Sequence, residues 1–110
     1  MSKRSDKTLL IDIREAVDKI LSYTAGLNGE SFAGNGMIAD AVIRNFEIIG
    51  EAASNLSDDF VKQHAEIPFR QMTSMRNRLI HGYFGVNLAT LWQVIRDDIP
   101  LLKKQLDSCQ

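Results

Sequence analysis

The sequence has very little cysteine: its one thiol, Cys109, stands next to the last of 110 residues. A single thiol cannot form an internal disulfide, so a disulfide-stabilised small domain is excluded. No group of cysteines and histidines has the spacing of metal ligands, and the sequence therefore predicts no metal site. Because tails fray, we expect Cys109 to be an exposed thiol.

Long apolar runs and an excess of one charge are also absent. No apolar stretch approaches the roughly 20 residues that span a bilayer, and charged residues interrupt the N-terminal segment, which excludes a signal peptide. The formal net charge is −1. A general polyanion binder would be basic, so any nucleic-acid contact must be local. These features predict a cytoplasmic protein without membrane contact.

Only two prolines occur, and glycine is sparse outside two loops, which favours helix over sheet. A chain of this length fits one domain, residues 1–110. We predict an all-α fold, an antiparallel bundle of four long helices plus one short helix. The expected segments are 5–24, 37–56, a short helix capped by Ser57, 68–81 and 88–106, the last one kinked or split at Pro100.

Apolar residues recur at steps of three and four in each long segment, the pattern of a helix with one buried face. Residues 25–36 break the pattern and predict a loop, with a possible short turn around Phe32. The expected core positions are Leu9, Ile13, Ala16, Val17, Ile20, Leu21, Ile38, Val42, Phe46, Ile49, Ala53, Leu56, Phe69, Met72, Leu79, Ile80, Leu88, Leu91, Trp92, Ile95, Ile99 and Leu102.

A polar stripe runs along the second long segment. Its members lie at steps of four, three and four and so share one side of the helix: Asp40, Arg44, Glu47 and Glu51. The stripe is either a solvated ladder of ion pairs or the lining of a cleft that faces the next long helix.

The segment "MRNRLIHGYF", residues 75–84, places ionisable side chains on an apolar helix. On a helical projection Arg76 falls inside the apolar face with Met72 and Leu79. An unpaired buried guanidinium is costly, so Arg76 must be paired or line a cleft. His81 lies five residues on, about 140° around the axis. A place where two helices or two subunits meet would let both side chains converge.

These residue types fit RNA cleavage without a metal or other cofactor. A guanidinium can bind a phosphate through two donors and stabilise the charge of a phosphorane-like transition state. An imidazole, with a reference pKa of about 6.5, exchanges protons near neutral pH. The RNA 2′-hydroxyl is a built-in nucleophile. Tyr83 offers a phenol near Arg76 and His81, either to position substrate or to accept a covalent modification.

The motif "RNRLIHGY" has the form R-x4-H-x-Y and resembles HEPN-domain ribonucleases. Three further segments resemble the HepT branch of that group: "RNFEIIGEAASNL" at 44–56, "IPFRQMTSMRNRLIHGYFGVN" at 67–87 and "LWQVIRDDIPLL" at 91–102. Within the first, "IGEA" at 49–52 is similar to the HepT second-helix signature. The resemblance covers nearly the whole chain.

The resemblance implies the toxin of a type VII-like HEPN/MNT toxin–antitoxin system, an all-α homodimer with a composite cleft that cleaves transfer RNA or messenger RNA. It makes Arg76 and His81 catalytic and Asn77 supporting. It also implies a partner, a minimal nucleotidyltransferase (MNT) antitoxin, which transfers AMP from ATP to Tyr83 and inactivates the toxin.

Other interpretations stay open. Arg76 could pair with Glu47 or Glu51 within one chain, and Tyr83 could be a rim residue of the bundle. Besides Arg44, Glu47 and Glu51, the possible cleft residues include two further arginines, Arg70 and Arg78, which fit solvated or RNA-backbone positions better than catalytic ones. His64 is expected to face solvent at a helix end. The alternative function is a non-catalytic accessory module that binds a nucleotide and presents it to a nucleotidyltransferase.

Overall fold

The computed structural model describes residues 4–81 and 87–109, with residues 80 and 81 described by their backbone alone. Every regular element in these ranges is a helix, which confirms the all-α prediction. The helices are α1 (Asp6–Thr24), α2 (Gly29–Ala33), α3 (Gly36–Ser54), α4 (Asp58–Gln63), α5 (Phe69–His81), α6 (Leu88–Asp97) and α7 (Ile99–Asp107).

Side-chain caps fix where the helices begin. Ser5, Ser57 and Asn87 each accept a hydrogen bond from a backbone N–H in the first turn that follows, as their positions in the sequence predict. Asn28 and Asn35 cap α2 and α3 in the same way. These bonds satisfy donors that have no partner within the helix.

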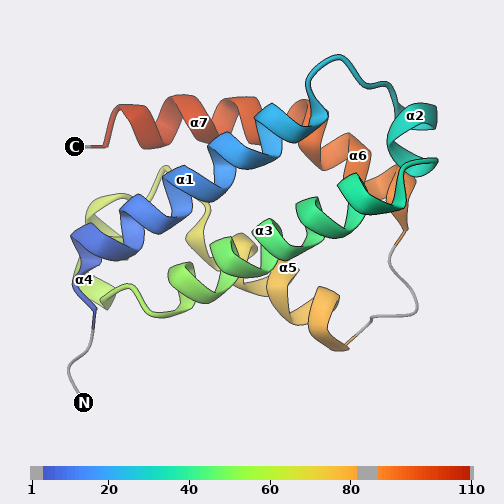
Figure 1. Ribbon diagram of the computed structural model, residues 1–110. Coiled ribbons are helices and arrows are strands. Elements are labelled where there is room, and N and C mark those ends of the chain that lie inside the picture. The colour runs from blue at the N-terminus through green and yellow to red at the C-terminus, as the bar shows by residue number, and fades with distance from the viewer. Residues whose placement is uncertain (1–3, 82–86, 110) are drawn as a thin grey trace.

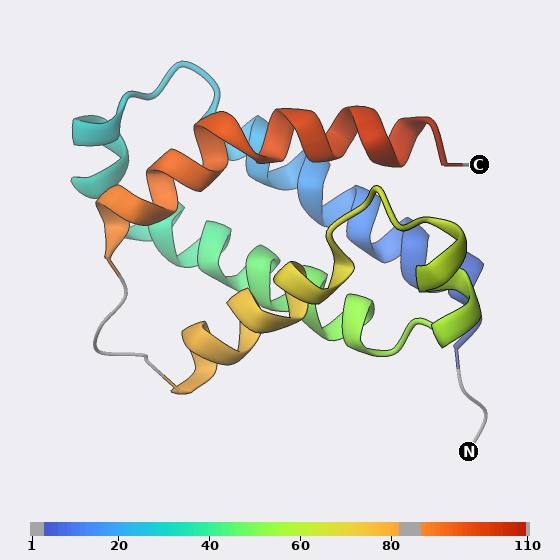
Figure 2. The same cartoon turned by 180° about the vertical axis from the view of Figure 1, so that it is seen from behind.

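Each successive long helix reverses direction, so that α1, α3, α5 and the α6–α7 pair form an antiparallel bundle (Figure 1). α3 packs against both α1 and α5, and α7 packs on α1. Seen from behind, the start of α1, α4 and the end of α7 lie toward one end, and α2 lies at the other (Figure 2). The short helix α2 holds the buried Phe32 against Trp92 of α6, with ring centroids 5.3 Å apart.

The last helix is divided, as Pro100 predicts. α6 ends at Asp97, and α7 begins at Ile99 with Pro100 in its first turn, where the missing N–H costs no helical hydrogen bond. The division lets two shorter helices follow different directions over the bundle.

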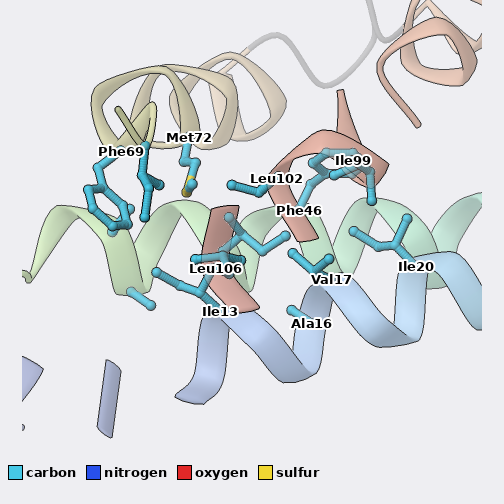
Figure 3. Close-up of a cluster of buried hydrophobic side chains, with 14 of the residues drawn as sticks. Ile13, Ala16, Val17, Ile20, Phe46, Phe69, Met72, Ile99, Leu102 and Leu106 are labelled. Atoms are coloured by element: carbon cyan, nitrogen blue, oxygen red, sulfur yellow. The ribbon is translucent and has the colours of Figure 1, made fainter. Parts of the chain in front are cut away.

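The apolar stripes meet in one core between α1, α3, α5 and α7 (Figure 3). Ile13 and Ile20 are fully buried. Four expected core residues, Leu21, Ile38, Leu88 and Trp92, are only partly buried against this core, and the side chain of Ile80 lies outside the described residues. The period of three and four residues therefore identified most of the buried face, but the expected positions did not include the buried Leu10, Ala39, Ala52, Ile67 and Leu106.

Two expectations about the chain's polar groups are wrong. Cys109 is not an exposed tail thiol: the residue is 5% exposed and its Sγ lies 3.5 Å from His64 Nδ1. Burial raises the pKa of the Cys109 thiol, and the Glu66 carboxylate adds to this effect. His64 follows the end of α4 but is only partly exposed, with its ring 4.5 Å from the Phe60 ring. The two residues pack together although 45 positions separate them.

Within residues 4–81 and 87–109, no helix is both long and apolar enough to cross a membrane.

Candidate functional site

The segment that carries the R-x4-H pattern is the C-terminal part of α5. The backbone is helical from Arg76 through His81, so both motif positions lie on one helix. Asn77 and Arg78, between them, are exposed. The side chain of His81 and the whole of Tyr83 lie outside the described residues.

Arg76 lies where α3 and α5 pack tightly together. Gly50 of α3 is buried against it, and a Cβ at this glycine would overlap Arg76 Cβ and lie 2.8 Å from Arg76 Cγ. The same Cβ would lie 2.7 Å from the carbonyl oxygen of Met72, one turn earlier in α5. Only a residue without a side chain lets the two helices pack at this distance.

The Arg76 guanidinium is paired within the chain. Its Nη1 donates to Glu51 Oε2 over 2.7 Å, where the Arg76 side chain is 22% and the Glu51 side chain 60% exposed. The Arg76 Nε is buried without a hydrogen-bond partner in the described part of the protein. The sequence left Glu47 and Glu51 open as partners of Arg76, and the structure shows that Glu51 is the partner.

Arg76 and Glu51 line a cleft of about 510 Å³ between α1, α3 and α5. Arg44 and Glu47, on the polar stripe of α3, line the same cleft. The remaining lining residues come from α1, from the segment before it, from α3 and from its C-cap: Arg4, Leu9, Asp12, Ile48, Ala52 and Asn55.

The charges of this cleft are balanced. Three arginines and three carboxylates line it, and two of the opposite pairs are in contact: Arg76 with Glu51, and Arg4 with Asp12 at 2.7 Å. The stripe of α3 does not form the ladder of ion pairs that was its other interpretation, because Glu51 alone of its four residues has an ion pair among the described residues. A cleft with balanced charges does not attract polyanions by net charge, so the binding of a polyanion there would depend on individual hydrogen-bond donors.

Two other arginines lie elsewhere. Arg78 lines a second cavity of about 550 Å³, between α5 and α6–α7, together with apolar side chains that include Met75 and Leu101. Arg70 is exposed and lines neither cavity. The structure thus brings Arg44, Glu47 and Glu51 to Arg76, and it keeps Arg70 and Arg78 apart from them.

Sequence reasoning missed three contributors to the site. Gly50 lies in the interior of α3, between Ile49 and Glu51, and an isolated glycine inside a helix signals close packing against a neighbour. Arg4 and Asp12 join the cleft only because α1 lies beside α3, and their spacing in the sequence carries no such signal. No group of three histidine, cysteine or acidic side chains with a metal-binding arrangement occurs in the described ranges.

Comparison with known proteins gives consistent matches along the chain. A family model described as Ribonuclease HepT-like matches residues 13–109. A protein of Thermococcus cleftensis named probable ribonuclease HepT is 46% identical over 105 residues, 96% of this chain and 96% of that relative. A candidate RNase of Methanocaldococcus jannaschii is 39% identical over 107 residues, 97% of this chain and 98% of its own.

A further candidate RNase, from Caldanaerobacter subterraneus, is 34% identical over 103 residues, 94% of this chain and 92% of its own. No solved structure gives a significant match. The family model covers most of the chain, and these relatives are matched over almost their entire lengths, which confirms the resemblance seen in the motifs. The chain belongs to the HepT-like ribonuclease family.

Proposed function

We propose that this protein is a metal-independent endoribonuclease that acts as the toxin of a HEPN/MNT toxin–antitoxin pair. Arg76 binds the scissile phosphate and His81 transfers protons. The observation that carries the proposal is the state of Arg76. In a chain of the HepT-like ribonuclease family, this motif arginine lines a cleft, its side chain is only 22% exposed, and its guanidinium is bound by Glu51.

The proposed reaction uses the substrate's own nucleophile. The RNA 2′-oxygen attacks the adjacent phosphorus, the bond to the 5′-oxygen of the next nucleotide breaks, and a 2′,3′-cyclic phosphate and a 5′-hydroxyl result. The 2′-hydroxyl loses a proton and the leaving oxygen gains one, both tasks for an imidazole near neutral pH. Negative charge builds on the phosphoryl oxygens, where the donors of Arg76 stabilise it.

The proposal includes a homodimer. Arg76 faces α3 of its own chain, and a residue five positions later is turned by about 140° around the α5 axis. A second copy would bring a second α5 to the cleft, so that an arginine of one chain and a histidine of the other meet across the interface. Asn77, exposed beside Arg76, would support substrate binding.

The family membership also supports a partner, an MNT-type nucleotidyltransferase that silences the toxin by transferring AMP from ATP to the Tyr83 hydroxyl. The phosphorus–oxygen bond forms at the phenol, and pyrophosphate leaves. A bulky anion two residues after His81 would block an RNA strand by volume and by like charge.

A cleavage assay in EDTA tests the nuclease proposal. We expect the purified protein to cleave RNA and to leave 2′,3′-cyclic phosphate or 3′-phosphate ends, and we expect Arg76→Ala and His81→Ala to abolish both cleavage and growth inhibition. Cleavage that requires an added divalent metal would contradict the proposed mechanism. Strong nucleotide binding without cleavage or toxicity would instead favour the accessory module.

Intact mass spectrometry tests the modification. With the nucleotidyltransferase partner and ATP, the mass of wild-type protein should rise in steps of one AMP, and Tyr83→Phe should stay unchanged. Tyr23→Phe is the matched control, because Tyr23 is an exposed tyrosine of α1 and is not part of the R-x4-H-x-Y motif. A mass increase in Tyr83→Phe would place the modification on another residue.

A further inference from the structure

The side chain of Arg76 is held at two points by consecutive residues of α3. Its aliphatic stem packs on Gly50, and its Nη1 bonds to Glu51. We propose that these two residues form a seat that fixes the guanidinium for RNA cleavage, with Glu51 as a positioning residue that acts through Arg76. The inference rests on the proposed function, since it assigns a role within the same site.

The stem is fixed by the absence of a side chain at Gly50. Because α3 and α5 approach so closely, the first two carbons of the Arg76 side chain occupy the space that a Cβ would need. The Nε beyond them is buried as well. A stem enclosed in this way has few rotamers open to it, so the guanidinium leaves the helix interface in one direction.

The tip is fixed by one carboxylate oxygen. Glu51 Oε2 accepts a hydrogen bond from Arg76 Nη1 at 2.7 Å. Arg76 Nη2 donates no hydrogen bond to any of the described residues. The guanidinium is a rigid planar fork, so holding one Nη also orients the other. The seat therefore leaves Nη2 available for a phosphoryl oxygen while its direction is already set.

The high exposure of the Glu51 side chain argues that its ion pair with Arg76 contributes little to folding stability. The Glu51 side chain is 60% exposed, and ion pairs at such positions contribute little to folding. Orientation of a catalytic group is far more sensitive, because a misplacement of about 1 Å can reduce a rate roughly 100-fold. Replacing Glu51 should therefore lower the rate of cleavage strongly while it changes the free energy of unfolding only slightly.

The test is a steady-state cleavage assay on one RNA substrate. For Glu51→Ala we expect kcat to fall roughly 10- to 100-fold with KM within about twofold. For Glu51→Gln, whose amide oxygen can still accept from Nη1, we expect most of that loss to be restored. Glu15→Ala removes another exposed carboxylate of a long helix, outside the cleft, and should match wild type.

Nuclear magnetic resonance of the free protein gives a second readout that does not depend on activity. The ion pair should slow rotation about the Nε–Cζ bond and keep the two Nη signals of Arg76 separate. We expect these signals to merge in Glu51→Ala and to stay separate in Glu15→Ala. Merged signals in wild type would overturn the proposed seat.

The outcomes separate the two proposals. Wild-type protein that cleaves no RNA overturns the proposed function, and the role of Glu51 with it. If wild type cleaves RNA and Glu51→Ala has an unchanged kcat, the nuclease function stands and the positioning role falls. It also falls if Glu51→Ala cleaves faster or binds RNA more tightly, because Glu51 would then compete with the phosphate for Arg76.

Discussion

Replacing Gly50 by alanine tests the close packing of α3 on α5, on which the position of Arg76 depends. The added Cβ would overlap Arg76 Cβ and lie 2.7 Å from the backbone oxygen of Met72. Carbon and carbonyl oxygen pack at about 3.3–3.6 Å. A rotamer change of Arg76 cannot relieve a clash with backbone, so the helices must separate by more than about half an ångström.

The expected cost follows from two opposing effects. The added Cβ meets Arg76 Cβ and the Met72 carbonyl oxygen, which no rotamer change can move, so we take the upper part of the usual overpacking cost, about 2–3 kcal/mol. Alanine gains up to about 1 kcal/mol over glycine in a helix interior. We expect Gly50→Ala to lower the free energy of unfolding by about 1–2 kcal/mol. For a chain of this size, that corresponds to a Tm decrease of roughly 5–15 °C.

Thermal unfolding followed by circular dichroism measures this change. Gly36→Ala is the matched control, because it is the same substitution in the same helix and a Cβ there meets nothing within 4 Å. We expect its Tm to equal or exceed that of wild type. Equal Tm values for the Gly50 and Gly36 variants would refute the argument that α3 and α5 require a glycine at their contact.

Three further predictions concern stability. Asp6→Ala removes a carboxylate that accepts hydrogen bonds from the Ser57 backbone N–H at 2.9 Å and from the Ser57 hydroxyl at 2.6 Å. This change should lower the free energy of unfolding, measured in urea, by about 1–2 kcal/mol, whereas Asp40→Ala, at an exposed position, should change it by less than about 0.5 kcal/mol. Ile13→Ala, at a fully buried position, should cost about 2–5 kcal/mol, and a loss below 1 kcal/mol would contradict its place in the core. Burial raises the pKa of Cys109, so the folded state keeps its proton where the unfolded state has lost it, and stability should fall as pH rises above the ordinary thiol pKa of about 8.5. This decrease should be smaller in Cys109→Ala, and identical slopes would exclude the thiol as its source.

The helices could be predicted from sequence because their signals are local. Ser57 before two aspartates predicts a helix start, and Pro100 predicts the division of the last helix; both hold in the structure. The period of apolar residues likewise predicts which face of each helix is buried, since that face follows from helical geometry alone.

The contacts between distant segments could not be predicted in this way. Glu47 and Glu51 share one stripe of α3, and only the crossing of α3 and α5 decides which of them meets Arg76. Cys109 looks like a tail residue in sequence, yet it packs beside His64, across 45 positions. Such pairings depend on how the helices are arranged in space, and the spacing of residues along the sequence does not predict that arrangement.

The rate of RNA cleavage in EDTA by wild-type protein and by Arg76→Ala, prepared in the same way, tests the central claim most directly. The account predicts that wild type cleaves and that Arg76→Ala loses at least about 100-fold in rate, by the scale for removing one charge-stabilising donor. Equal rates for the two proteins would contradict it, because the cleavage would then not depend on the arginine seated between α3 and α5.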